Sequence, residues 1–230
     1  SGGAVQLYDG AVLSVVGQTS VLRDNTASRW SGAVRLTGPD TAVEVQGAAA
    51  QLVVTGNAAQ NGGGGGIEGN GMVIVDAGVL NVSGNAASQD GGGLRILGEI
   101  SLVKQGTLVL ESNSARQNGG GLHLGGQLDV NTGVLNVNGN TARDDGGGLY
   151  VSGEITLAHN GTLVLESNSA GRNGGGLYLS GPNAGYRSEL PPAQFMEWGK
   201  PTVGGHALSW HPLAGKNGNP TPGFRATPYP

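Results

Sequence analysis

The stretch NSARQNGGGL, residues 113–122, is one of a series of near copies within the chain. Related stretches read NSAGRNGGGL at 168–177, NAASQDGGGL at 85–94 and NTARDDGGGL at 140–149. Each opens with Asn and closes with three glycines and a leucine. The opening residues are Asn25, Asn57, Asn85, Asn113, Asn140 and Asn168, which follow one another at intervals of 32, 28, 28, 27 and 28. A repeat of this length indicates a solenoid.

The residues between two motifs fall into short alternating runs. LRIL at 94–97, EISLV at 99–103 and TLVLES at 107–112 each alternate apolar and polar residues and are bounded by Gly or Asn. Period-two runs of this length predict strands, and the frequent glycines argue against helices. The sequence therefore predicts an all-β fold, a parallel β-helix with three short strands per coil of about 28 residues. About six to seven such coils fill residues 1–181.

Equal positions in successive coils should lie above one another and form buried columns. One predicted inward column is Leu52, Leu80, Leu108, Leu135 and Leu163, and a second is Val54, Val82, Leu110, Val137 and Leu165. A third contains Leu36, Ile96, Leu124, Val151 and Leu179. Burial of each such side chain contributes about 1.5–3 kcal/mol, and one coil cannot bury them alone. At a strand spacing of ~4.8 Å, six coils make a rod roughly 30 Å long.

The repeated Asn and Gly residues are interpreted as turn formers. Asn tolerates left-handed backbone geometry, and its amide can donate to and accept from the next Asn along the axis, which predicts a structural turn ladder. The glycines would supply positive φ and a close backbone approach at a tight corner. A phosphate-binding loop is disfavoured, because neither Lys-Ser/Thr nor a helix follows the glycines.

The motif also resembles the repeats of chlamydial polymorphic outer-membrane proteins and related autotransporter passengers. Those repeats combine a Gly-Gly-Ala-Ile element with a Phe-x-x-Asn element. SGGAV at residue 1 and SGAVRL at residue 31 match the first, while LESNSA at residues 110 and 165 matches the second with Leu in place of Phe. The resemblance covers residues 1–181. It implies an exported, right-handed parallel β-helix at the cell surface or outside the cell, used in adhesion or surface architecture.

Residues between the inward columns are expected to face solvent. One such column reads Arg35, Glu68, Arg95, His123, Tyr150 and Tyr178. His123, Tyr150 and Tyr178 form a candidate ligand face, on which aromatic rings could stack on sugars. In another column Glu111 and Glu166 stand two coils apart with Asn138 between them, which avoids repulsion between like charges on adjacent strands. The favoured interpretation of both columns is a simple solvated surface. The functional alternative is a lateral contact face, to which His123, Tyr150 and Tyr178 would contribute.

Several classes of function have little support in the sequence. The net charge is −4 with no basic stripe, so nucleic acid is not an expected partner, and no apolar run is long enough to span a membrane. Cysteine is absent, the four histidines are scattered, and no catalytic constellation is visible, so we expect no enzyme activity, metal or cofactor. Asn81 and Asn160 begin glycosylation sequons.

The composition changes after Gly181. Nine of the ten prolines lie from Pro182 onward. Residues 182–230 are therefore expected to form an extended tail without a persistent strand, which caps the last coil or straps neighbouring subunits together. Its predicted anchors are the aromatic residues Phe195, Trp198, Trp210 and Phe224.

These features favour an extracellular structural protein that assembles with copies of itself through its coil ends and its tail. The repeat pattern begins and ends at the same position within a coil, which suits head-to-tail stacking of copies. Such stacking can propagate into a filament or a surface layer. The alternative is a cell-surface adhesin or passenger module that binds a host or glycan ligand. A polysaccharide-active enzyme is a third interpretation, which the lack of clustered carboxylates disfavours.

Overall fold

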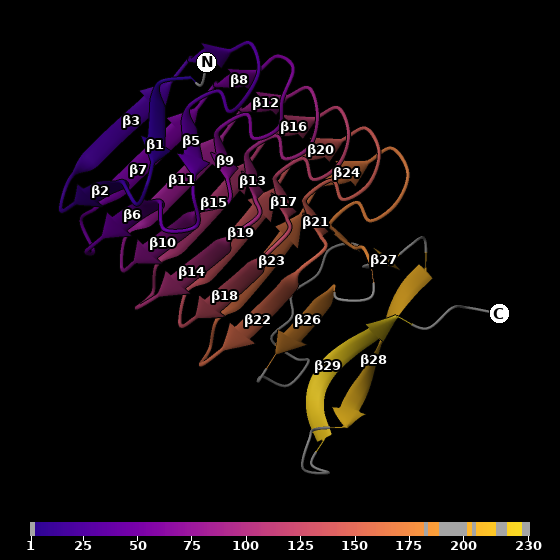
Figure 1. The fold of residues 1–230 in the computed structure, drawn as a ribbon. Helices are drawn as coiled ribbons and strands as arrows, with labels where there is room; N and C mark the ends of the chain where they lie inside the picture. Colours follow the sequence, from indigo (N-terminus) through magenta and orange to yellow (C-terminus); the bar gives the residue numbers. More distant parts are fainter. Residues whose placement is uncertain (1–2, 182–183, 189–201, 204–205, 215–219, 227–230) are drawn as a thin grey trace.

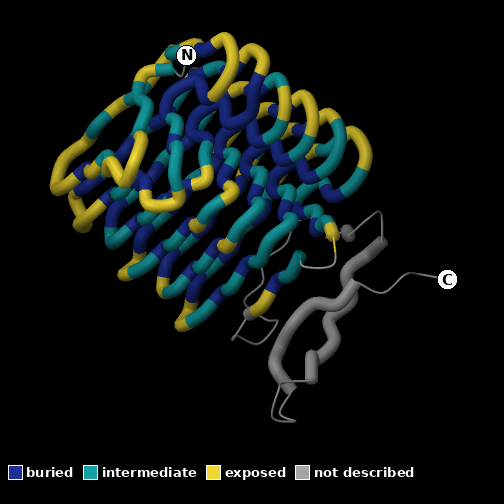
Figure 2. Tube along the Cα trace, viewed as in Figure 1, coloured by how far each residue is buried: buried dark blue, intermediate teal, exposed yellow. Residues whose placement is uncertain are grey.

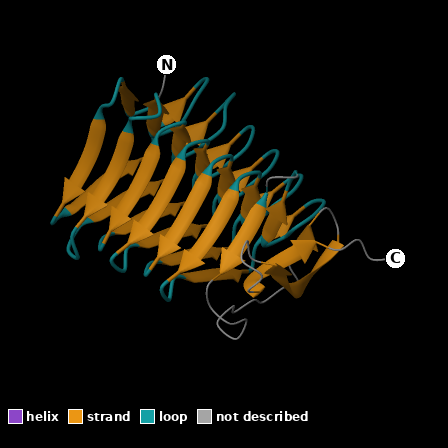
Figure 3. Ribbon diagram, turned by 60° about the horizontal axis from the view of Figure 1, so that its bottom comes forward, coloured by secondary structure: helices purple, strands orange, loops and turns teal. Residues whose placement is uncertain are grey.

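The parallel β-helix is confirmed by a computed structural model, which describes residues 3–181, 184–188, 202–203, 206–214 and 220–226. Beyond Arg187 the description is of the backbone alone. Figure 1 shows the coils stacked in sequence order along one axis. The described residues form no helix, and the strands of each coil align with those of the next in four sheets (Figure 3).

Sheets A and B each begin in the first coil. Sheet A contains β1 (Val5–Tyr8), β5 (Val34–Thr37), β9 (Ile67–Gly69), β13 (Leu94–Ile96), β17 (Leu122–Leu124), β21 (Leu149–Val151) and β25 (Leu177–Leu179). Sheet B contains β2 (Val12–Val16), β6 (Ala42–Gln46), β10 (Met72–Asp76), β14 (Glu99–Val103), β18 (Gln127–Asn131), β22 (Glu154–Ala158) and β26 (Gly185–Ser188), followed by strands of the tail.

Sheets C and D lie on either side of the Asn corner. Sheet C contains β3 (Thr19–Arg23), β7 (Gln51–Thr55), β11 (Val79–Ser83), β15 (Thr107–Glu111), β19 (Val134–Asn138) and β23 (Thr162–Glu166). Sheet D contains the two-residue strands β4 (Thr26–Ala27), β8 (Ala58–Ala59), β12 (Ala86–Ala87), β16 (Ser114–Ala115), β20 (Thr141–Ala142) and β24 (Ser169–Ala170). The coil thus has a fourth, very short strand that the alternation of the sequence does not reveal.

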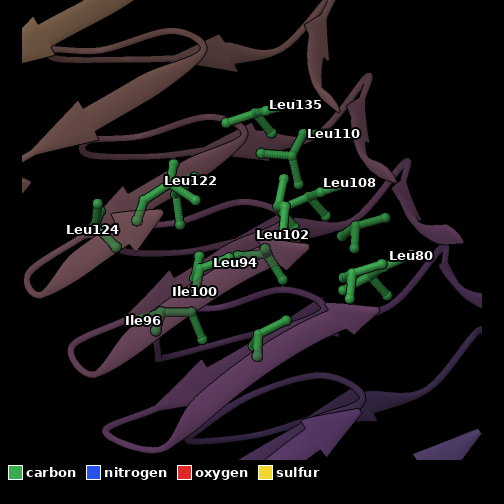
Figure 4. Close-up of a cluster of buried hydrophobic side chains, with 14 of the residues drawn as sticks. Leu80, Leu94, Ile96, Ile100, Leu102, Leu108, Leu110, Leu122, Leu124 and Leu135 are labelled. Carbon is green, nitrogen blue, oxygen red and sulfur yellow. The ribbon is translucent and has the colours of Figure 1, made fainter. Parts of the chain in front are cut away.

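The three predicted columns are buried in the core, which also contains inward residues of sheet B such as Ile100 and Leu102. Leu80 is in register with Leu52 and Leu108, and the other inward residues stack in the same way. From the second coil onward these side chains are at most 8% exposed, and Figure 2 shows them as a buried interior inside exposed turns. The leucines and isoleucines from neighbouring coils point toward one another in Figure 4. In the first coil Val5, Leu7, Leu13 and Leu22 are only partly buried.

The parallel sheet continues beyond Gly181 into the tail. Strand β26 pairs with β22 in parallel, and Tyr186 takes the inward position above Ile155. Strands β27 (Thr202–Val203), β28 (His206–Ala214) and β29 (Pro220–Ala226) are antiparallel to their neighbours, and β29 meets β26 at Arg187 and Gly223. The expectation that the tail contains no persistent strand is therefore wrong. The prolines do not prevent pairing: Pro212 and Pro222 lie opposite each other in this hairpin.

Candidate functional site

The six repeated asparagines form a continuous hydrogen-bonded ladder at the corner between sheets C and D. At each of its five steps, the backbone N–H and the Nδ2 of one Asn donate to the Oδ1 of the next at 2.9–3.0 Å. From Asn57 onward each Nδ2 also donates to a strand carbonyl of the preceding coil, as Asn113 does to Val82. Buried amides are thereby fully partnered, as a polar group in a core must be.

The left-handed backbone lies one residue before each Asn rather than at the Asn itself. Positive φ values between 53° and 65° occur at Asp24, Gly56, Gly84, Ser112, Gly139 and Ser167. The expectation that the Asn adopts this geometry is wrong. The preceding residue turns the chain, and the Asn is left free to use its amide along the axis.

The three glycines of the motif have two different roles. The first, such as Gly119 with φ of +66°, adopts the left-handed conformation. The second and third are required by close packing between coils instead. A Cβ at Gly120 would lie 2.3 Å from the carbonyl oxygen of Gly147, far inside contact distance. Successive corners therefore stack backbone on backbone.

A second ladder lies five residues after each of the last four asparagines. Its members are Asp90, Asn118, Asp145 and Asn173. Asn118 donates its N–H and Nδ2 to Oδ1 of Asp90 at 3.1 and 3.0 Å, and Asn173 does the same to Asp145 at 3.0 and 2.8 Å. Between them, the Asp145 N–H donates to Oδ1 of Asn118. The sequence interpretation missed this ladder, although the fixed offset from the repeated Asn was a visible signal.

The six-residue outer column of sheet A is in continuous register but is not freely exposed. Arg35, Glu68, Arg95, His123, Tyr150 and Tyr178 are each paired with the next. Glu68 is only 4% exposed and the others are half-buried, so the expectation of a solvent-facing column is wrong. The reason is the glycine-rich loop of each coil, which folds back over this face. A Cβ at Gly63 would lie 2.3 Å from Cδ of Arg95.

The N-terminal half of this column is an ionic group. The Arg95 Nη1 donates to Glu68 Oε1 at 3.0 Å, and the Arg35 guanidinium lies 4.2 Å from the centre of the Trp30 ring. Burial raises the pKa of Glu68, although the charges of Arg95 and Arg35 oppose this. Oε2 of Glu68 is buried and has no hydrogen-bond partner among the described residues. A buried carboxylate of this kind is costly unless its charge is compensated.

The C-terminal half is an aromatic stack. The His123 and Tyr150 rings meet edge to face at 4.8 Å, and Tyr150 stacks on Tyr178 at 5.3 Å. Tyr150 Oη donates to Ser180 Oγ at 2.9 Å. The structure thus brings the three residues of the proposed ligand face together. Their ring faces are turned largely to one another, however, so they do not form a flat platform for a sugar ring.

Acidic residues of the second ladder lie close to this stack. His123 Nδ1 lies 3.4 Å from Oδ2 of Asp90, too long for a well-formed hydrogen bond but close enough for charge attraction. Burial alone would raise the pKa of Asp90, but interactions with His123 and Asn118 outweigh it and lower this pKa. The pKa of Tyr178 is raised by burial and by the nearby Asp145 and Tyr150.

The remaining candidate residues are dispersed. His159 lies in a turn with φ of 47°, and His206 and His211 lie on β28. The described residues contain no group of three side chains suited to hold a metal. Asn81 is in the middle of β11, whereas Asn160 is in an exposed turn with φ of 71°. Of the predicted tail anchors, Trp210 and Phe224 are opposite each other in the backbone register. Phe195 and Trp198 lie outside the described residues.

Two of the shallow hollows on the outer surface are lined by described residues. One, of about 520 Å³, crosses sheet D over small residues such as Ala58, Ala86 and Ser114, with Arg116 at its edge. The other, of about 360 Å³, lies on sheet C; its lining is Val109, Glu111, Asn136, Val137, Asn138, Val164 and Glu166. The alternating acid–amide column expected from the sequence borders this second hollow, because Glu111, Asn138 and Glu166 are in register.

Comparison of the chain with protein-family models, curated proteins and solved structures finds no match. None of the described segments is a helix of the length and apolar character needed to cross a membrane. The class that the fold defines is a parallel β-solenoid, whose repeated polar side chains bond mainly to their counterparts in neighbouring coils.

Proposed function

We propose that this chain is a non-enzymatic structural subunit, located outside the cell or at its surface, that associates with copies of itself. The observation that carries the proposal is the use of its polar residues. Asn113 has an Asn at the same position in each neighbouring coil, and Asn118 has an Asp there; both side chains bond along the axis to these neighbours. Side chains that could serve chemistry are thereby committed to holding the coils together, as expected for a scaffold.

The ends of the coil stack support association along the axis. In sheets C and D the strands β3, β4, β23 and β24 each pair with one neighbour only among the described strands. Among the described residues, no donor reaches Oδ1 of Asn25, at the acceptor end of the Asn ladder. Edge strands are templates for pairing with another chain. A second copy stacked head to tail would continue the ladder in the same direction, with its Asn168 next to Asn25.

Electron microscopy of the full chain and of a chain ending at Ser188 tests this proposal. Stacks or filaments with an axial repeat of ~30 Å, from six strand spacings, are expected for the full chain. Their loss in the shortened chain would assign the contact to the tail, whereas their retention would assign it to the coil ends alone. Isolated short rods at every concentration would overturn the proposal.

The hollow on sheet D supports a second candidate, an adhesive or display module. Its floor of Ala58, Ala86 and Ser114 leaves room for an extended ligand along the axis, and Arg116 could bind an acidic group. Screening the chain and an Arg116→Ala variant against a glycan array tests this. Binding that depends on Arg116, by a chain that remains monomeric, would favour this function over assembly.

A further inference from the structure

The outer face of sheet C carries one valine on every strand. The outward valines are Val21, Val53, Val79, Val109, Val134 and Val164. The register places them in two adjacent columns, so from the second coil onward they alternate between these columns along the axis. Thr, Asn, Ser and Gln occupy most of the other outward positions, and the face carries few charges. It is therefore a continuous, weakly apolar strip.

The two ends of this face differ in shape. At its C-terminal end the hollow of about 360 Å³ lies over β15, β19 and β23. At its N-terminal end Val21 projects from β3 with 52% of its surface exposed. One half of the face thus has a depression and the other a projecting apolar side chain.

The charges on this face are also divided between its ends. Arg23 at the first strand and Glu111 and Glu166 at the fourth and sixth occupy one column, with uncharged Thr55, Ser83 and Asn138 between them. Arg23 and Glu111 are exposed and Glu166 is partly so. Neither Arg23 nor Glu166 has an ion-pair partner among the described residues.

We propose that sheet C is a lateral docking face for a second copy of this chain, with the two solenoid axes antiparallel. A two-fold axis parallel to the strands brings the first strand of one copy opposite the sixth of the other. Arg23 then faces Glu166 twice, and Val21 enters the partner's hollow beside Val164. Glu111 faces Ser83, so no like charges meet.

The parallel arrangement of the two axes fits less well. In that case each strand faces its own counterpart, so Val21 meets Val21 and the two hollows face each other. Arg23 meets Thr19 of the other copy, and no ion pair forms. Charge complementarity and shape thus both select the antiparallel arrangement.

The contact is expected to be weak. Six strands of five residues give a face of roughly 29 by 16 Å, hence about 900 Å² for both copies together, close to the lower limit for a specific interface. The inference rests on the proposed self-association and adds a lateral contact to the axial one. Sheets stacked in this way lie ~10 Å apart with interdigitated side chains.

Charge exchange measured by analytical ultracentrifugation tests the ion pair. Arg23→Glu and Glu166→Arg should each weaken lateral dimerisation at least about tenfold, and the double variant should restore it. Arg29→Glu reverses an exposed charge in the loop after β4, outside sheet C, and serves as the matched control. Circular dichroism establishes that each variant is folded. Dimerisation that survives either single exchange, or that the double exchange does not restore, overturns the lateral contact.

Cysteine pairs test the orientation, because the chain contains no cysteine. A Val21→Cys/Val164→Cys double variant should form disulfide-linked dimers under mild oxidation. Val21→Cys alone should not, because the two first strands are five spacings, about 24 Å, apart. Cross-linking by Val21→Cys alone would overturn the antiparallel arrangement. If the chain associates and none of these variants alters that association, the lateral contact through sheet C is wrong and the proposed self-association stands. If the wild type is strictly monomeric, both the lateral contact and the proposed self-association are wrong.

Discussion

The Asn ladder and the outer column of sheet A both stack one polar or aromatic side chain per coil along the axis, but they satisfy these side chains in different ways. In the ladder one residue type repeats, and each amide is both donor and acceptor for its neighbours. In the outer column the residue type changes at each coil, from Arg and Glu to His and Tyr. The ladder leaves its buried amides partnered, whereas the column leaves Oε2 of Glu68 and Nδ1 of His123 without hydrogen bonds among the described residues.

This difference shows which side chains can be stacked at the spacing of a β-helix. Among buried polar side chains, only a group that carries donor and acceptor together can repeat at every strand spacing of ~4.8 Å with its hydrogen bonds satisfied. Acids must be separated, which is why Asp90 and Asp145 alternate with Asn118 and Asn173. Aromatic rings can repeat only if they tilt or offset, as Tyr150 and Tyr178 do.

The largest effect is expected from breaking the ladder in its middle. Asn113→Ala removes the acceptor of Asn85 and the donor to Val82 and Asn140, all buried. The free energy of unfolding should fall by on the order of 4 kcal/mol, because several buried groups lose their partners. Urea denaturation measures the loss, with the exposed Ser114→Ala as control. Equal effects at the two positions would show that the ladder contributes little.

A smaller loss is expected when the close approach of the corners is disturbed. Gly120→Ala should destabilise the chain by about 1–3 kcal/mol, because the new Cβ collides with backbone of the next coil. Gly17→Ala is the matched control: its φ is +65° but nothing lies within 4 Å of the added Cβ. Its cost should be limited to backbone strain of about 1–2 kcal/mol. Thermal unfolding of both variants separates clash from strain, and a milder effect at Gly120 would contradict the packing argument.

The features that depend on periodicity were predictable from the sequence. The inward columns, the coil boundaries and the positions of the corner asparagines follow from alternation and a spacing of 27 or 28 residues. The close approach of glycines was also inferred. Each of these features depends on residues that are close in sequence or one repeat apart, and it therefore produces a regular pattern in the sequence.

The features that were missed depend on the path of the loops. The burial of Glu68 follows from the way the loop containing Gly63 and Gly64 folds back over sheet A. The left-handed turn occurs at Ser112 rather than Asn113, and two-residue strands such as β16 are too short to produce an alternating pattern. Pairing of β28 with β29 was not predicted, because the proline content of these tail segments argues against strands.

Titration of Glu68 sharpens the comparison between the two columns. Because burial raises the pKa of Glu68, the folded state binds this proton more tightly than the unfolded state. The stability from this group is therefore complete below the unfolded pKa and is lost as pH rises through the folded pKa. Relative to Glu68→Gln, the wild type should therefore gain stability as pH falls from neutral toward 4.5, the ordinary pKa of a glutamate. Urea denaturation at several pH values measures this difference, and a pH-independent difference would contradict it.

Asp90 should show the opposite dependence and the smallest effect. Interactions with His123 and Asn118 lower its pKa despite burial, so its stabilising contribution is present above the unfolded pKa of 3.8 and is lost as pH falls through the folded pKa. Asp90→Asn keeps an acceptor for Asn118 but cannot titrate. The wild type should therefore lose stability relative to this variant in acid, by less than about 1 kcal/mol because the carboxylate is partly solvated. Guanidinium denaturation between neutral pH and the acid range measures this, with Asp129→Asn, on the outer face of sheet B, as control. If the wild type instead lost stability relative to Asp90→Asn toward neutral pH, the pH dependence of Asp90 would have the same sign as that of Glu68. There would then be no distinction between an acid held by amide donors and one buried between arginines.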